Sequence, residues 1–126
     1  MSDPIQKSTD TSFETEGPVV LVNVFTPANG DVQAFIDVQI SEYKNLRGKV
    51  AGWIGNTFCR SIDGAKAINI AVFENREKYH EWRYSEYFRE HIEVIKPLIE
   101  KAEPYIVQPI YGDSQKNPVE GILVTA

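Results

Sequence analysis

Cysteine, basic residues and long apolar runs are all scarce in this sequence. Cys59 is the one cysteine, so no internal disulfide forms, and no spacing of cysteine or histidine typical of a zinc site is present. The longest apolar run, residues 18–22, ends at Asn23 and is too short to cross a bilayer. Residues 1–7 are polar and lack the apolar core of a signal peptide, so we expect a cytoplasmic protein.

The balance of charge argues against nucleic-acid and membrane partners. The chain of 126 residues has 13 Lys and Arg against 18 Asp and Glu, a net charge of −5. A phosphate-binding groove or a polybasic membrane anchor needs a basic patch, and neither is expected here. Apolar residues make up 42% and charged residues 25%, which is typical of a soluble globular protein of one domain.

Apolar residues are concentrated between two polar ends of the chain. Residues 1–17 are rich in Ser, Thr, Asp and Glu, which predicts a flexible N-terminal arm. Residues 18–112 form the predicted domain, and residues 113–126 a tail in which Gly121–Thr125 is suited to an extra strand.

Within the domain, the spacing of apolar residues predicts strands at 18–26, 52–60, 65–74 and 104–111, and helical regions at 31–47 and 75–102. Ser85 is predicted to cap a new helix after a break at Arg83–Tyr84. The order β-α-β-β-α-β predicts an α+β, ferredoxin-like fold whose antiparallel sheet carries both helices on one face. The other face needs a cover, which predicts a homodimer formed through the sheet faces.

Asparagine interrupts two strands that are otherwise apolar. Asn69 shares a predicted strand face with small alanines and Phe73, whereas the opposite face is uniformly β-branched. Asn23 shares a face of the first strand with Leu21 and Phe25. A buried amide is costly without a partner, so each amide either satisfies nearby backbone or lines a polar pocket between sheet and helices.

The second helical region is dense in aromatic residues and histidine, a composition that is most often core. Trp82 and His91 are nine residues apart, which places them on opposite sides of an unbroken helix. The two side chains line one cavity only if the helix breaks between them.

Three stretches resemble the antibiotic biosynthesis monooxygenase family: VLVNVFTP at 20–27, INIAVFENREKY at 68–79 and WRYSEYF at 82–88. The resemblance spans about residues 18–112 and implies a small dimeric α/β barrel of ferredoxin-like fold. The family is functionally mixed, so it leaves more than one activity open.

The quinone-forming branch of this family oxidises anthrones or related polyphenols with O₂ and uses no cofactor or metal. This chain is similar to it at Asn23, Asn69 and Tyr79, but has Phe73 where that branch commonly has tryptophan. The expected function is therefore a cofactor-independent monooxygenase of an electron-rich aromatic substrate. The expected catalytic residues are Asn23, Asn69, Tyr79 and Trp82, and the expected substrate-binding residues are Phe25, Phe73, Phe88 and His91.

The heme-degrading branch offers the alternative. Asn23, Trp82 and His91 match its residues in order, and the resemblance implies His91 as the iron ligand with Trp82 against the porphyrin. A second alternative is a non-catalytic dimer that binds a hydrophobic small molecule.

Overall fold

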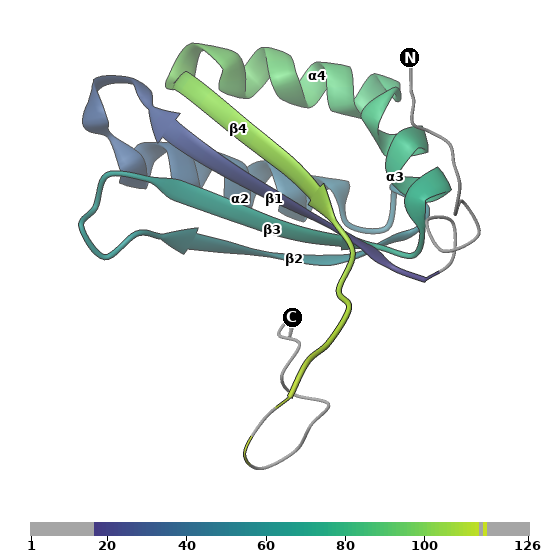
Figure 1. Ribbon diagram of the computed structural model, residues 1–126. Coiled ribbons are helices and arrows are strands. Elements are labelled where there is room, and N and C mark those ends of the chain that lie inside the picture. The colour runs from purple at the N-terminus through teal and green to yellow at the C-terminus, as the bar shows by residue number, and fades with distance from the viewer. Residues whose placement is uncertain (1–16, 114, 116–126) are drawn as a thin grey trace, which may run out of the picture.

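A four-stranded antiparallel sheet carries the helices on one of its faces in the computed structural model, which describes residues 17–113 and 115 (Figure 1). The strands lie in the order β2-β3-β1-β4, so β1 and β3 form the central pair. Along the chain the elements are β1 (Val19–Pro27), a 3₁₀ turn (Ala28–Gly30), α2 (Val32–Leu46), β2 (Trp53–Arg60), β3 (Ala67–Phe73), α3 (Arg76–Arg83), α4 (Glu86–Ile95), a second 3₁₀ turn (Lys96–Leu98) and β4 (Ile99–Val107). The predicted ferredoxin-like α+β fold is confirmed.

Side-chain caps set where the helices begin. The Asp31 carboxylate accepts a hydrogen bond from the Ala34 amide at 3.1 Å and starts α2. The Ser85 hydroxyl accepts from the Phe88 amide at 3.1 Å and starts α4, immediately after α3 has ended at Arg83. The predicted break in the second helical region is therefore confirmed.

The end of that helical region differs from the prediction. A helix reaching residue 102 and a strand over 104–111 are both wrong, because β4 already begins at Ile99 and ends at Val107. Pro97 lies in the 3₁₀ turn that closes the helical region, where its missing N–H prevents continuation of the α-helix. Pro104 lies inside β4, which an edge strand tolerates. Residues 1–16 of the arm predicted at 1–17, and the strand predicted at 121–125, lie outside the described residues.

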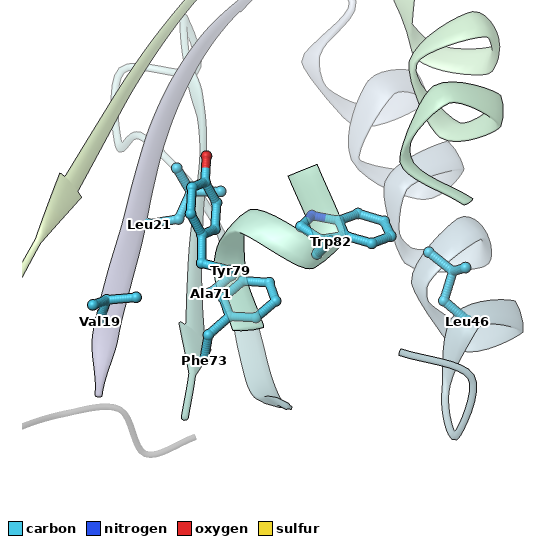
Figure 2. Close-up of a cluster of buried hydrophobic side chains, with 7 residues drawn as sticks. All are labelled: Val19, Leu21, Leu46, Ala71, Phe73, Tyr79 and Trp82. Carbon is cyan, nitrogen blue, oxygen red and sulfur yellow. The ribbon is translucent and has the colours of Figure 1, made fainter. Parts of the chain in front are cut away.

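Two clusters of buried apolar side chains form the core between sheet and helices. The first contains Val19, Leu21, Leu46, Ala71, Phe73, Tyr79 and Trp82 (Figure 2). The second contains Phe25, Val32, Phe35, Ile36, Ala67 and Ile95. Because β1 and β3 are antiparallel, the two clusters lie at opposite ends of the central strand pair.

The sheet face turned away from the helices, here called the far face, is apolar and half-buried. Its central residues are Val20, Val22 and Val24 of β1 and Ile68, Ile70 and Val72 of β3. On β4, Tyr105 and Val107 pair with Val22 and Val20 and are 58% and 42% exposed. Within the described part of the chain, nothing covers this face. No helix there has the length and apolarity that a membrane crossing requires.

The α2–β2 loop is held against α3 at Gly52. This residue has φ +82°, and a Cβ at this position would overlap Cβ and Cγ of Lys78. The Gly52 carbonyl also accepts a hydrogen bond from the Glu74 amide at 2.8 Å. Only glycine satisfies both the backbone angle and this close approach. Gly48, in the same loop, has the same φ but open space around it.

We therefore expect Gly52→Ala to destabilise the protein more than Gly48→Ala. Both substitutions incur about 1–2 kcal/mol for a left-handed residue with a Cβ. Gly52→Ala adds a clash with Lys78 worth about 1–3 kcal/mol. Urea unfolding measures both free energies, and equal losses for the two variants would show that the contact with Lys78 does not constrain the loop.

Candidate functional site

Asn23 and Asn69 lie directly opposite each other in the β1–β3 ladder, and both face the helices. On β1, Asn23 is flanked on that face by Leu21 of the first apolar cluster and Phe25 of the second. On β3, the two alanines that flank Asn69 are divided between the clusters in the same way. The amides therefore mark the boundary between the two clusters.

Both neighbouring helices place polar residues at the same boundary. Gln39 of α2 is 1% exposed and lies between Ile36 and Tyr43 on the buried side of that helix. His91 of α4 is 3% exposed and precedes Ile95 of the second cluster by one turn. We call Asn23, Gln39, Tyr43, Asn69 and His91 the polar layer, because together they separate the apolar clusters.

Hydrogen bonds link Asn69 to a neighbouring strand and to a helix. The Asn56 Nδ2 of β2 donates to Asn69 Oδ1 at 3.1 Å. The Asn69 side chain also hydrogen-bonds to the Tyr43 hydroxyl. Burial strongly raises the pKa of Tyr43, and this hydrogen bond only partly offsets the rise. Tyr43 is therefore a neutral phenol throughout the physiological pH range.

The Tyr43 ring fills the centre of the polar layer. Its ring centroid lies 5.2 Å from that of His91, 5.4 Å from Phe58, 5.5 Å from Trp53 and 6.3 Å from Trp82. Aromatic contacts at these distances and at tilted or edge-on angles are favourable. Tyr43 therefore connects the two tryptophans and the histidine, which come from three different elements.

His91 is paired with a carboxylate at the margin of the layer. Its Nδ1 lies 3.2 Å from Glu42 Oε1, and the Glu42 side chain is 26% exposed. Burial lowers the pKa of His91, and the nearby Glu42 carboxylate opposes part of that shift. The imidazole is therefore neutral at pH 7, with Glu42 placed to stabilise its protonated form.

Several buried polar atoms in or beside the layer have no hydrogen-bond partner among the described residues. They are Asn23 Oδ1, Gln39 Oε1, Gln39 Nε2 and Trp53 Nε1. Such atoms are rare in folded proteins and are usually satisfied by water or by a ligand. An amide with both of its polar atoms free, as in Gln39, can donate to one oxygen and accept from another.

Two of the predicted catalytic residues, Tyr79 and Trp82, come from α3. Trp82 lies close to the polar layer, whereas Tyr79 lies farther from it. The Trp82 ring is 6.3 Å from that of His91, so the helix break does bring these two residues together. Tyr79 packs edge-on against Phe73 at 5.5 Å and lines a pocket of about 290 Å³ with Arg76 and His80. Its hydroxyl points past Leu21 along β1 (Figure 2).

The predicted substrate-binding phenylalanines do not surround one cavity. Phe25 packs against Phe35 at 4.8 Å in the second apolar cluster, whereas Phe73 belongs to the first. Phe88 packs edge-on against Trp82 at 5.3 Å and lines a surface pocket beside Arg89. His91 is the one member of this predicted group that lies in the polar layer.

The heme alternative requires a porphyrin face next to His91. A metal-bound histidine commonly donates a hydrogen bond from its other ring nitrogen to a carboxylate, and Glu42 lies beside His91 Nδ1 as such a partner. However, the imidazole is buried against the rings of Tyr43 and Trp82. A porphyrin would have to displace one of these rings, so the residues as arranged do not fit heme. The described residues also form no group of three or more His, Cys, Asp and Glu suited to a metal ion.

A pocket of about 640 Å³ opens at the edge of the sheet, next to the polar layer. We call it the loop pocket; residues 47–51 of the α2–β2 loop and 53–56 at the start of β2 line it. Asn56 lines this pocket and also donates to Asn69 inside. Trp53 lines it and contacts Tyr43. The loop pocket therefore adjoins the polar layer through two lining residues that contact members of the layer.

The sequence reasoning missed Gln39, Glu42, Tyr43 and Asn56 as site residues. Gln39 carried a usable signal, because it stands within the apolar stripe of the helix, one turn after Phe35 and Ile36. The partners of Asn69 carried none, since they come from β2 and α2, far away in the sequence.

Comparison with known proteins places most of the domain in one family. The family model for antibiotic biosynthesis monooxygenases matches residues 18–94. SnoaB, a cofactor-independent oxygenase from Streptomyces nogalater, superposes with a TM-score of 0.65 at 21% identity, covering 75% of this chain and 94% of that chain. Rv0793 from Mycobacterium tuberculosis superposes with a TM-score of 0.65 at 17% identity, covering 77% and 99%.

At these identities the superpositions establish the fold. No curated protein matches the chain. The family model, however, covers more than half of the chain, including both asparagine-bearing strands and the first part of the aromatic helical region. The chain belongs to the antibiotic biosynthesis monooxygenase family.

Proposed function

We propose that this protein is a cofactor-independent oxygenase that converts an electron-rich aromatic substrate, of the anthrone or polyphenol class, to a quinone. Membership of the family supports an oxygenase, and a structural neighbour described as a cofactor-independent oxygenase supports chemistry without a bound cofactor. The substrate class is chosen for its chemistry, because a readily formed, delocalised carbanion can reduce O₂ without a metal or a flavin.

The observation that carries the proposal is the set of unpartnered amide atoms in the polar layer. Asn23 and Gln39 leave an acceptor, and in Gln39 also a donor, without a partner in a buried, mostly apolar interior. Donors fixed in a dry site stabilise developing oxyanions far better than water does. A substrate oxygen or O₂-derived anion placed here would be met by one neutral donor of the layer, Gln39 Nε2, while the free amide oxygens could accept from a substrate hydroxyl.

The reaction requires one proton acceptor and one place for negative charge. The substrate CH₂ group loses a proton, and its carbanion transfers one electron to O₂. The radical pair then combines to a C–O bond, and protonation gives a hydroperoxide. Loss of water leaves the carbonyl, so the substrate and O₂ yield the quinone and one H₂O. We assign proton acceptance to His91, which a substrate reaches only if the Tyr43 or Trp82 ring moves aside, and whose protonated form Glu42 would stabilise.

Asn69→Ala tests the role of the polar layer. Removing this amide frees both Asn56 and Tyr43 and takes a donor from the layer, so anthrone-dependent O₂ uptake is expected to fall about 10²–10³-fold in kcat. An oxygen electrode measures uptake, and circular dichroism checks the fold. Asn45→Ala, at an exposed asparagine of α2, is the matched control and should retain full activity.

Unchanged uptake in Asn69→Ala would contradict the assignment of this site. No uptake by the unmodified protein above the spontaneous rate, with anthrone bound, would instead favour the non-catalytic binder.

Hemin titration separates the proposal from heme degradation. Because Tyr43 and Trp82 enclose His91, we expect no saturable Soret band that depends on this histidine. The measurement compares the unmodified protein with His91→Ala in the Soret region. A stoichiometric band that His91→Ala abolishes would overturn the oxygenase proposal in favour of the heme-degrading activity.

We also propose that the far face is covered by the same face of a second copy. Its six central residues are all Val or Ile and stay only half-buried in one chain, next to Tyr105 and Val107. A contiguous apolar surface of this kind is typical of an interface, and self-complementary burial gives a two-fold dimer.

Ile70→Lys is expected to shift the protein from dimer to monomer, since it places a charge at the centre of the far face between Val22 and Thr57. Val94→Lys, on α4 and 45% exposed, introduces the same charge elsewhere and should leave the dimer intact. Sedimentation velocity gives both masses. A monomeric unmodified protein at micromolar concentration would refute the interface.

A further inference from the structure

The loop pocket has a basic rim in a protein that is acidic overall. Arg47 and Lys49 are the charged residues that line it, and no acidic residue does. Among the described residues, neither side chain takes part in an ion pair or a hydrogen bond. These two positively charged side chains have no negative partner in the described part of the chain, although the chain as a whole has a net charge of −5. Their positive charge favours the binding of an anion in the pocket.

The backbone of the rim is fixed before any ligand arrives. The Lys49 amide donates to the Leu46 carbonyl at 2.9 Å, and the Gly52 carbonyl accepts from Glu74 at 2.8 Å. Positive φ angles at Gly48 and Gly52 shape the loop between these bonds. A loop anchored at both ends holds its cations in place at little entropic cost on binding.

The rest of the pocket combines apolar and polar residues. Val50 and Trp53 line it, and among the described residues the buried Trp53 indole Nε1 has no hydrogen-bond partner. Asn56 brings an amide into the pocket from the side of the polar layer. A volume of about 640 Å³ lies within the range of pockets that take drug-sized molecules.

We infer that the loop pocket recognises an acidic group, a carboxylate or ionised phenol, on a polycyclic aromatic substrate. Arg47 and Lys49 bind the anion, the rings lie against Trp53, and the reacting edge is directed through Asn56 toward Asn69. The inference rests on the proposed function in one respect: that the molecule bound in the loop pocket is the substrate of the oxygenase. It narrows that substrate class to acidic aromatics.

Two unreactive probes that differ in charge test the inference. Anthraquinone-2-carboxylate and 2-(hydroxymethyl)anthraquinone share the ring system, and quenching of tryptophan fluorescence reports the binding of each. We expect the carboxylate to bind about tenfold more tightly at low salt, with a preference that shrinks as salt rises. The double variant Arg47→Gln with Lys49→Gln should remove that preference while leaving the affinity of the neutral probe unchanged.

The matched control is the double variant Lys44→Gln with Lys96→Gln. It removes the same charge from exposed positions outside the pocket, and should keep the preference for the carboxylate. Equal binding of the two probes by the unmodified protein would overturn the inference, as would a preference that survives loss of Arg47 and Lys49. The latter result would place the anion elsewhere.

These outcomes are separate from those that test the oxygenase. Because the quinone probes do not react, their binding is independent of O₂ uptake. Anthrone oxidation combined with equal probe binding would refute only the acidic specificity. A preference that depends on the loop pocket in a protein without anthrone oxidation would refute the oxygenase and leave the pocket as an anion-recognition site.

Discussion

The pairing of Asn23 with Asn69 across the two central strands fixes which face of β1 and β3 meets the helices. A one-residue slip of β1 against the core would turn Asn23 to the far face and drive branched side chains into the helix interface. In the native register both amides face the helices, and Asn23 Oδ1 has no partner there among the described residues. Asn69 does have partners: its side chain hydrogen-bonds to Asn56 of β2 and Tyr43 of α2, which ties these two elements to the centre of the sheet.

The apolar clusters and the polar layer contribute differently to the stability of the core. The two apolar clusters at the ends of β1 and β3 supply the hydrophobic burial that holds the helices on the sheet. The layer between them contributes less, because each amide left without a partner costs about 1–3 kcal/mol. The buried, unpartnered Gln39 is therefore consistent with the proposed ligand site.

Local sequence signals predicted most of the fold. Alternation in Ala67–Phe73 gave the strand and its faces, and Ser85 marked the helix break. The bounds of β4 could not be predicted from these local signals. Pro104 suggests that a strand begins there, because proline is excluded from central strands, and only the structure shows that β4 is an edge strand that tolerates it. The facing of Asn23 and Asn69 followed from strand alternation. Their partners did not, because Tyr43 and Asn56 reach Asn69 only through tertiary packing of distant segments.

The distribution of charge suggests that the polar layer and the loop pocket would contact different parts of the proposed substrate. At pH 7 every residue of the polar layer is neutral, and Glu42 stays at its margin. A dry interior of this kind stabilises charge that develops during reaction but admits a permanent anion only at high cost. An acidic substrate would therefore leave its fixed charge at the rim, beside Arg47 and Lys49, while its reacting carbon approaches the amides. Under this proposal the binding charge and the reacting charge would be kept apart, and the unpartnered Gln39 Nε2 would be left for the oxyanion.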